Sequence, residues 1–316
     1  MSTLKVALSS LSVSLLAFGV THAQTYPVKP IRILTVQAGS ASDLASRLLA
    51  KELQESLGQP VIVDNRGLIA AELAAQAPPD GYTLLHYTSP IWIVPLFRSV
   101  GWDVERDLAP IALTVFSPNI LVVHPSLPVK TVKELIAFAK QRPGELNYGT
   151  SSTGSSNHLA GELFKSMAGV NMVRVAFKGG GQSVNSLVSG EMQVSFPAAA
   201  SIMGAINSGK VRALAVTSAK PTALVPGLPT MAQSGLPGYE TISYTCLFAP
   251  ARTPPALVTR LSEEVARALR VPSVEERLFS VGSEVVASSP AQAAATIKSE
   301  TQRIRKLIHD AGLREQ

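Results

Sequence analysis

The sequence of 316 residues has a single cysteine, Cys246, and only 5% aromatic residues. One cysteine cannot form an internal disulfide, so we expect the fold to be stabilised by core packing. The same count excludes a zinc site built from clustered cysteines and histidines. We therefore expect neither a metal ion nor a cofactor.

Runs of like charge are also lacking, as are basic patches interleaved with aromatic residues. The formal net charge of +6 comes from 28 basic and 22 acidic residues that are scattered along the chain. This distribution argues against nucleic-acid binding. A mildly basic protein does suit an anionic ligand.

Long apolar runs are absent except for a short one at the N-terminus. Lys5 precedes an apolar stretch from Val6 to Val20, which serines interrupt and which is followed by Ala23. This order predicts a signal peptide over residues 1–23, cleaved near Ala23. A membrane anchor is the alternative, but a span needs about 20 continuous apolar residues. We therefore expect export to the periplasm.

The rest of the chain alternates short β-branched runs with amphipathic helical stretches. Residues 31–36 have the pattern of a buried strand, and residues 44–57 have a helical spacing that Gly58 closes. The alternation restarts after a proline-marked passage at 118–128. It predicts an α/β fold of two lobes, with two parallel-rich sheets flanked by helices.

We expect crossing strands at residues 119–124 and 211–217 to join the two lobes. The first lobe then comprises residues 24–122 plus 218–316, and the second comprises residues 123–217. A hinge of two strands permits the lobes to close on a ligand. In open parallel sheets, ligands bind beyond the carboxyl ends of the strands, where helices begin.

Three loops of small and polar residues lie between a predicted strand and a predicted helix. Free backbone N–H groups at a helix start attract an anion, and small residues let a ligand approach the backbone. The candidate ligand-binding residues in these loops are Gln37, Gly39, Ser40, Asp43, Ser152, Thr153, Gly154, Ser155, His158, Lys178 and Gly179. The alternatives are helix capping by Asp43, a His158 bonded to backbone, and a solvent-exposed Lys178.

Catalytic motifs are missing. There is no G-x-S-x-G, H-E-x-x-H or Walker motif, and no G-x-G-x-x-G follows the first strand. Ser155 and His158 have a spacing at which the hydroxyl could meet the ring, but no third member is identifiable. A periplasmic serine hydrolase is therefore the weaker alternative, and we expect a binding protein rather than an enzyme.

Five segments spread over the mature chain have an order and wording typical of one family. They are YPVKPIR at 26–32, LGQPVIVDNR at 57–66, PDGYTL at 79–84, HLAGELFK at 158–165 and GLPGYE at 235–240. With these segments the whole mature chain resembles the Bug (TctC-type) family of extracytoplasmic receptors for tripartite tricarboxylate transporters. The chain departs from the family pattern in a first loop that lacks a proline, an aromatic residue and one glycine, and in a shortened loop at Gly67.

The resemblance implies a Venus-flytrap fold that holds a small carboxylate in its cleft, with contacts from the first loop and from the serine/glycine loop before His158. Pro197 is added to the candidate residues because it stands where members often have an aspartate. The implied ligands are di- or tricarboxylates, acidic amino acids or aromatic acids. The implied partners are the membrane subunits of a tripartite transporter or, alternatively, a membrane sensor, and we expect a monomer.

Overall fold

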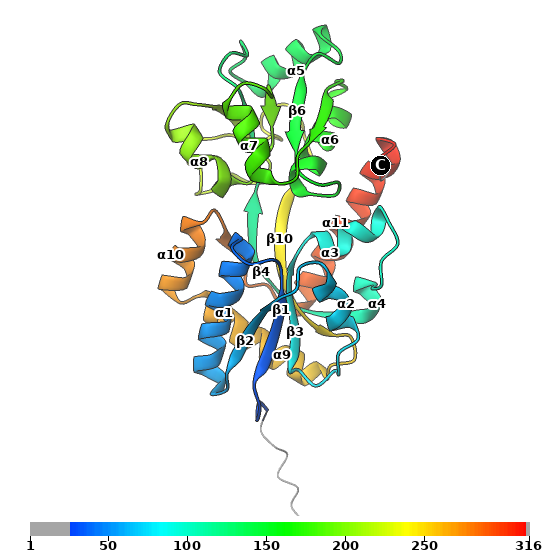
Figure 1. Cartoon of the computed structure of the whole chain (residues 1–316), viewed down its shortest axis with the longest axis vertical. Coiled ribbons are helices and arrows are strands. Elements are labelled where there is room, and N and C mark those ends of the chain that lie inside the picture. The colour runs from blue at the N-terminus through cyan, green and yellow to red at the C-terminus, as the bar shows by residue number, and fades with distance from the viewer. Residues whose placement is uncertain (1–25, 314–316) are drawn as a thin grey trace, which may run out of the picture.

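The computed structural model describes residues 26–313 and confirms the predicted α/β fold (Figure 1). Two sheets with flanking helices form two lobes, one above the other in Figure 1. The predicted signal peptide lies outside the described residues. Within residues 26–313, every helix is too short or too polar to cross a membrane.

The first lobe is built on a six-stranded sheet with the order β11-β4-β10-β3-β1-β2. Its strands are β1 (Ile31–Thr35), β2 (Val61–Asn65), β3 (Thr83–Thr88), β4 (Leu108–Pro118), β10 (Ile242–Pro250) and β11 (Glu284–Val285). Its helices are α1 (Ala41–Leu57), α2 (Ile69–Ala75), α3 (Pro90–Ile93), the 3-10 helix η1 (Val94–Leu96), α4 (Val104–Asp107), α9 (Pro255–Leu269), α10 (Pro272–Ser280) and α11 (Pro290–Asp310).

The second lobe is built on a five-stranded sheet with the order β7-β6-β8-β5-β9. Its strands are β5 (Ile120–Val123), β6 (Asn147–Thr150), β7 (Val173–Ala176), β8 (Val194–Ser195) and β9 (Arg212–Val216). Its helices are α5 (Val132–Gln141), α6 (Ser156–Ala168), α7 (Gly180–Val188) and α8 (Ala199–Asn207).

Each sheet is parallel in one half and antiparallel in the other. Strand β1 pairs parallel with β2 and β3, and β6 pairs parallel with β7 and β8. These are the halves that the βαβ rhythm predicted. The antiparallel half of the first sheet comes from β4 and β10, which the sequence pattern did not predict. Pro110 and Pro118 within β4 obscure its strand pattern, because proline is uncommon inside a sheet.

The two crossings between the sheets are hydrogen-bonded to each other. The chain leaves the first sheet at Asn119, between β4 and β5, and returns after β9 through residues 217–241. The backbone N–H of Asn119 donates to Thr217 Oγ1 over 2.9 Å. The N–H of Thr217 donates to the Asn119 carbonyl, and the N–H of Thr241 donates to the Thr217 carbonyl, both over 3.0 Å.

These crossings shift the predicted lobe boundaries. Strand β5 pairs within the second sheet, so the second lobe starts near Ile120 rather than at residue 123. The sequence pattern places residues 218–241 in the first lobe, but Met231, Leu236 and Tyr239 are buried in the core of the second. The Tyr239 hydroxyl also donates to the carbonyl of Ala160 over 2.7 Å. The sequence pattern missed this because the segment is anchored by single side chains and not by a periodic element.

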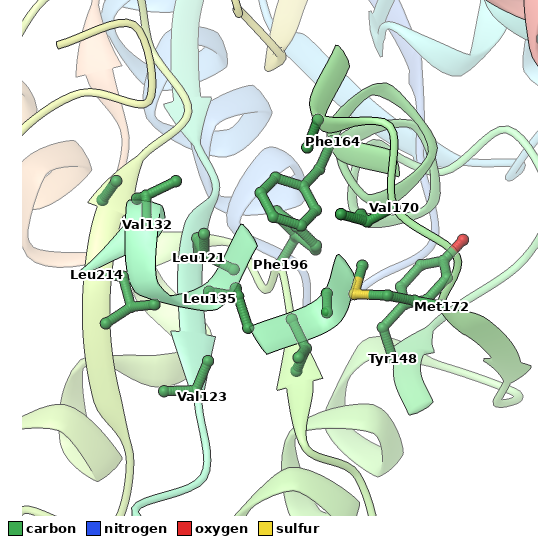
Figure 2. Packing of buried hydrophobic residues seen from close by; sticks show 14 of the residues in the cluster. Leu121, Val123, Val132, Leu135, Tyr148, Phe164, Val170, Met172, Phe196 and Leu214 are labelled. Carbon is green, nitrogen blue, oxygen red and sulfur yellow. The ribbon is translucent and has the colours of Figure 1, made fainter. Parts of the chain in front are cut away.

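The core of the second lobe packs α5 and α6 against the sheet (Figure 2). Phe164 and Phe196 lie at its centre, with ring centroids 5.8 Å apart. Helix α6 approaches β6 closely because Gly161 has no side chain. A Cβ at Gly161 would lie only 2.2 Å from the Tyr148 ring.

This close approach predicts that Gly161→Ala destabilises the protein. Alanine usually favours a helix over glycine by about 1 kcal/mol, but overpacking a core costs about 1–3 kcal/mol. We expect a lower free energy of unfolding in chemical denaturation. Gly204→Ala in α8 is the matched control, because a Cβ there meets nothing within 4 Å. The control should be neutral or stabilising, and equal effects of the two substitutions would contradict the prediction.

Candidate ligand-binding site

The serine/glycine loop after β6 is held together by Asn157. Asn157 Oδ1 accepts hydrogen bonds from the backbone N–H of Ser151 over 3.3 Å and from its hydroxyl over 3.0 Å. It also accepts one from the Ser155 hydroxyl over 2.6 Å. Asn157 was not among the predicted site residues, although it lies within the predicted loop. Its carbonyl oxygen fixes the loop and leaves other donors open.

Those donors are the first N–H groups of α6. Among the described residues, no hydrogen-bond acceptor is assigned to the backbone N–H of Ser156, Asn157 or His158. The N-cap residue Ser155 makes no side-chain capping bond, and its hydroxyl lies 2.6 Å from both the Ser152 carbonyl and Asn157 Oδ1, to either of which it can donate. Unpaired N–H groups and the helix dipole together favour an anion at this position.

A guanidinium group adds positive charge beneath the same loop. Arg174 on β7 donates from Nε to Thr150 Oγ1 over 3.0 Å. Its terminal nitrogens donate to Thr153 Oγ1 over 3.2 Å and to the Ser151 carbonyl over 3.3 Å. All of these acceptors are neutral, so Arg174 contributes its charge to the loop. Its position in the sequence, an arginine between two valines of a short strand, is the signal that could have indicated this role.

His158 is bonded to the backbone, which is one of the two alternatives that the sequence left open. Its Nδ1 accepts a hydrogen bond from the Gly154 N–H over 3.2 Å. Burial, with a smaller contribution from the charge of Arg174, lowers the pKa of His158 to about 4. The ring is therefore neutral at pH 7. Among the described residues no hydrogen bond joins it to Ser155, so the pair proposed for a hydrolase is not formed.

The first loop, between β1 and α1, is organised by Asp43 and Ser40. Ser40 is the N-cap of α1, and its hydroxyl accepts from the Asp43 N–H. The buried Asp43 carboxylate accepts from the Gly39 N–H over 3.0 Å and from Asn65 Nδ2 over 2.8 Å. Burial alone would raise the pKa of Asp43, but bonds from Asn65, Gly39 and Arg47 outweigh it and lower the pKa. Asp43 is thus engaged in holding the loop.

An open hollow of about 390 Å³ lies beside the first loop. Gln37, Ser40 and Ser42 line one side, and Gly67 and Thr88 line another. Gly67 has a φ of +59°, which few other residues adopt, and a Cβ there would touch the Gln37 side chain. The shortened Gly67 loop therefore packs directly on the first loop.

The third loop starts helix α7 at the end of β7. Gly179 is the N-cap, and Lys178 is exposed, with its N–H bonded to Gln182 Oε1 over 3.2 Å. Pro197 lies elsewhere, at the hinge. It is buried, and its carbonyl accepts from the Ile120 N–H over 2.9 Å.

Contacts between the lobes bring the serine/glycine loop to the first lobe. A Cβ at Gly154 would lie 3.5 Å from the Phe97 ring, and the centroid of that ring is 6.4 Å from that of the His158 ring. Thr88 at the end of β3 lines the hollow at the first loop and also a cavity that Gly154 and Ser155 border. The hollow at the first loop and the cavity at the serine/glycine loop are therefore neighbours, and the cavity is the one that residues of both lobes line.

A buried polar network supports the first lobe below this cleft. His86 Nδ1 lies 2.7 Å from Ser46 Oγ, and His86 Nε2 lies 2.8 Å from Thr114 Oγ1. Thr35 Oγ1 is also 2.7 Å from Ser46 Oγ, so α1 is tied to β1 and β3. Burial lowers the pKa of His86 to about 3, which keeps the ring neutral. Within residues 26–313, no cluster of His, Cys, Asp and Glu is arranged to hold a metal ion.

Comparison with known families identifies the family of this two-lobed protein. The model of the "Tripartite tricarboxylate transporter family receptor" matches residues 45–313. The chain belongs to this family. Its members are binding-protein receptors and not enzymes, so the hydrolase alternative is wrong and the receptor prediction is confirmed.

Individual relatives match this chain over nearly its full length. BugT of Bordetella pertussis is 34% identical over 298 residues, which cover 92% of this chain and 91% of BugT. Rpa4515 of R. palustris, solved with adipate, is 36% identical with a TM-score of 0.78, covering 91% of this chain and 98% of that one. MatC of Rhodopseudomonas palustris, solved with malate, is 28% identical with a TM-score of 0.75, covering 90% and 100%.

The two buried histidines predict an acid-sensitive fold. In the unfolded chain a histidine titrates near pH 6.5, whereas His86 and His158 titrate near 3 and 4 when folded. Between these values the unfolded state binds more protons, so stability falls as the pH falls. Each histidine should lower the free energy of unfolding by about 2 kcal/mol between pH 7 and pH 5.

Denaturant unfolding at pH 7, 6 and 5 measures this loss. His158→Asn should remove about half of the pH dependence that the two histidines cause, because Asn cannot take up a proton. His309→Asn, at a residue whose side chain is 90% exposed, is the control for replacing a histidine and should remove less of the pH dependence than His158→Asn. A free energy of unfolding that is constant from pH 7 to pH 5 would contradict the prediction.

Proposed function

We propose that the receptor captures a small carboxylate in the periplasm and delivers it to the membrane subunits of a tripartite transporter. The carboxylate binds at the start of α6, between the serine/glycine loop and the first loop at α1. The periplasmic location rests on the predicted signal peptide and on relatives described as periplasmic, such as BugD. Delivery to a transporter rests on the family's description.

The donors around the start of α6 are the observation that supports a carboxylate as the ligand. Three backbone N–H groups have no partner there among the described residues, and the Arg174 guanidinium lies beneath the loop bonded to neutral oxygens. The carboxylates of the two helices that begin at the proposed site do not compete. Glu162 is bonded to the Tyr148 hydroxyl and to Lys165, and Asp43 is bonded to Gly39, Asn65 and Arg47. Adipate and malate in two relatives match this chemistry.

Carboxylates should therefore stabilise the folded receptor. A ligand present at about 100 times its Kd adds roughly 2.7 kcal/mol to the free energy of unfolding. A thermal-shift screen of carboxylates, followed by calorimetry, measures this effect. Amides of the same acids are the control, and equal stabilisation by acid and amide would contradict a site for an anion.

Asn157→Asp tests the position of the site. Aspartate keeps the shape and the accepting oxygen that hold Ser151 and Ser155, but it adds a negative charge at the start of α6. We expect affinity for carboxylates to fall at least about tenfold, because a nearby like charge opposes binding of an anion. Asn171→Asp, at an exposed position in the same lobe, is the control. Unchanged affinity in Asn157→Asp would place the carboxylate elsewhere.

A further inference from the structure

A second depression continues from the serine/glycine loop toward the hinge. It is a cavity of about 190 Å³ between the two lobes, and Gly154, Ser155 and Ser156 form one end of it. From there it extends between helix α6 of the second lobe and helix α11 of the first, which rises beside the second lobe (Figure 1). The proposed carboxylate position and this cavity therefore share the start of α6.

The walls of the cavity are mainly apolar. Leu159 and Leu163 project from α6, Ile304 and Leu307 project from α11, and Ile93 closes the side toward α3. An apolar cavity of about 150 Å³ is large enough to bind benzene. The present cavity is therefore large enough for an aromatic ring or for an alkyl chain of similar volume.

The charges in the wall do not favour a second anion. Arg303 is the one cation among the lining residues that the structure describes, and it pairs with Glu240 over 2.8 Å. Glu300 is buried beside it, and its Oε2 accepts from Trp92 Nε1 over 2.8 Å. The end of the cavity thus holds two carboxyl groups and one guanidinium. A second carboxylate here would lose its hydration without gaining a free cation.

We propose that this cavity is the second half of the ligand site and takes the apolar body of a monocarboxylate, an aryl or short alkyl acid, and that it selects against dicarboxylates. This inference rests on the proposed function, because the carboxylate at α6 sets the direction of the ligand. The ligand lies with its charged end at Ser156 and its apolar body between Leu163 and Leu307.

Calorimetry with full-length mature receptor and ligands of matched length tests the inference. The probes are butanoate and hexanoate, with adipate as the dicarboxylate of the same length as hexanoate. Affinity should rise about fourfold for each methylene from butanoate to hexanoate, as expected for burial of a CH₂ group. Hexanoate should bind at least about tenfold more tightly than adipate, since the second carboxylate of adipate finds no free cation.

Two variants test the volume and the charge of the cavity separately. Leu163→Phe fills the cavity from a half-buried position, so it should weaken hexanoate at least about tenfold and leave butanoate nearly unchanged. Glu300→Gln keeps an acceptor for Trp92 and removes a charge. At pH 8 it should narrow the difference between adipate and hexanoate, because burial raises the pKa of Glu300 to about 7 and the carboxyl is mainly ionised there.

Failure of this inference can be told from failure of the proposed function. If no carboxylate binds, or if hexanamide binds as tightly as hexanoate, the carboxylate receptor itself is refuted. If carboxylates bind but adipate equals hexanoate, or if Leu163→Phe weakens butanoate and hexanoate equally, the receptor stands and the role of the cavity is overturned.

Discussion

The fold depends on the hydrogen bonds that join its two crossings. Thr217 Oγ1 accepts from the Asn119 N–H and lies 2.5 Å from the Thr241 carbonyl, to which it donates. Asn119 in turn donates from its side chain to the Phe196 carbonyl. One threonine hydroxyl therefore connects the chain leaving the first lobe with the chain returning to it. Because both crossings meet at one point, a hinge rotation of the two lobes would be centred there.

With the hinge fixed, the direction of the strands determines which helices begin at the cleft. β1 and β6 both run toward the cleft, so α1 and α6 both begin there, from opposite lobes. Each helix start is organised by a side chain from its own first turn, Asp43 in α1 and Asn157 in α6. The donors are thus set locally, within each lobe, before any ligand is present. Closure then has only to bring two prepared surfaces together, which limits the entropy lost on binding.

The sequence predicted the parts of this arrangement that are local. A glycine- and serine-rich loop between a strand and a helix is visible in the order of residues, so the loops at Ser40 and Ser155 were found. Asn157 and Arg174 were missed because their roles depend on neighbours that the fold brings to them, Ser151 for one and Thr153 for the other. Strand β4 was missed for a related reason, since its prolines contradict a strand and only pairing with β10 establishes it.

The placement of charge in the cleft connects these features to ligand choice. Close to the start of α6, the charge of Glu162 is compensated by Lys165, while the charge of Arg174 meets only neutral oxygens. Toward the hinge it is the cation that is compensated, because Arg303 is paired with Glu240. Glu300 has the neutral side chain of Trp92 as its hydrogen-bond partner. For the ligand position proposed above, these pairings favour an anion at the start of α6 and disfavour one beside Glu240 and Glu300. A ligand that is charged at one end and apolar at the other follows this change along its length, and its orientation is then determined by electrostatics rather than by shape alone.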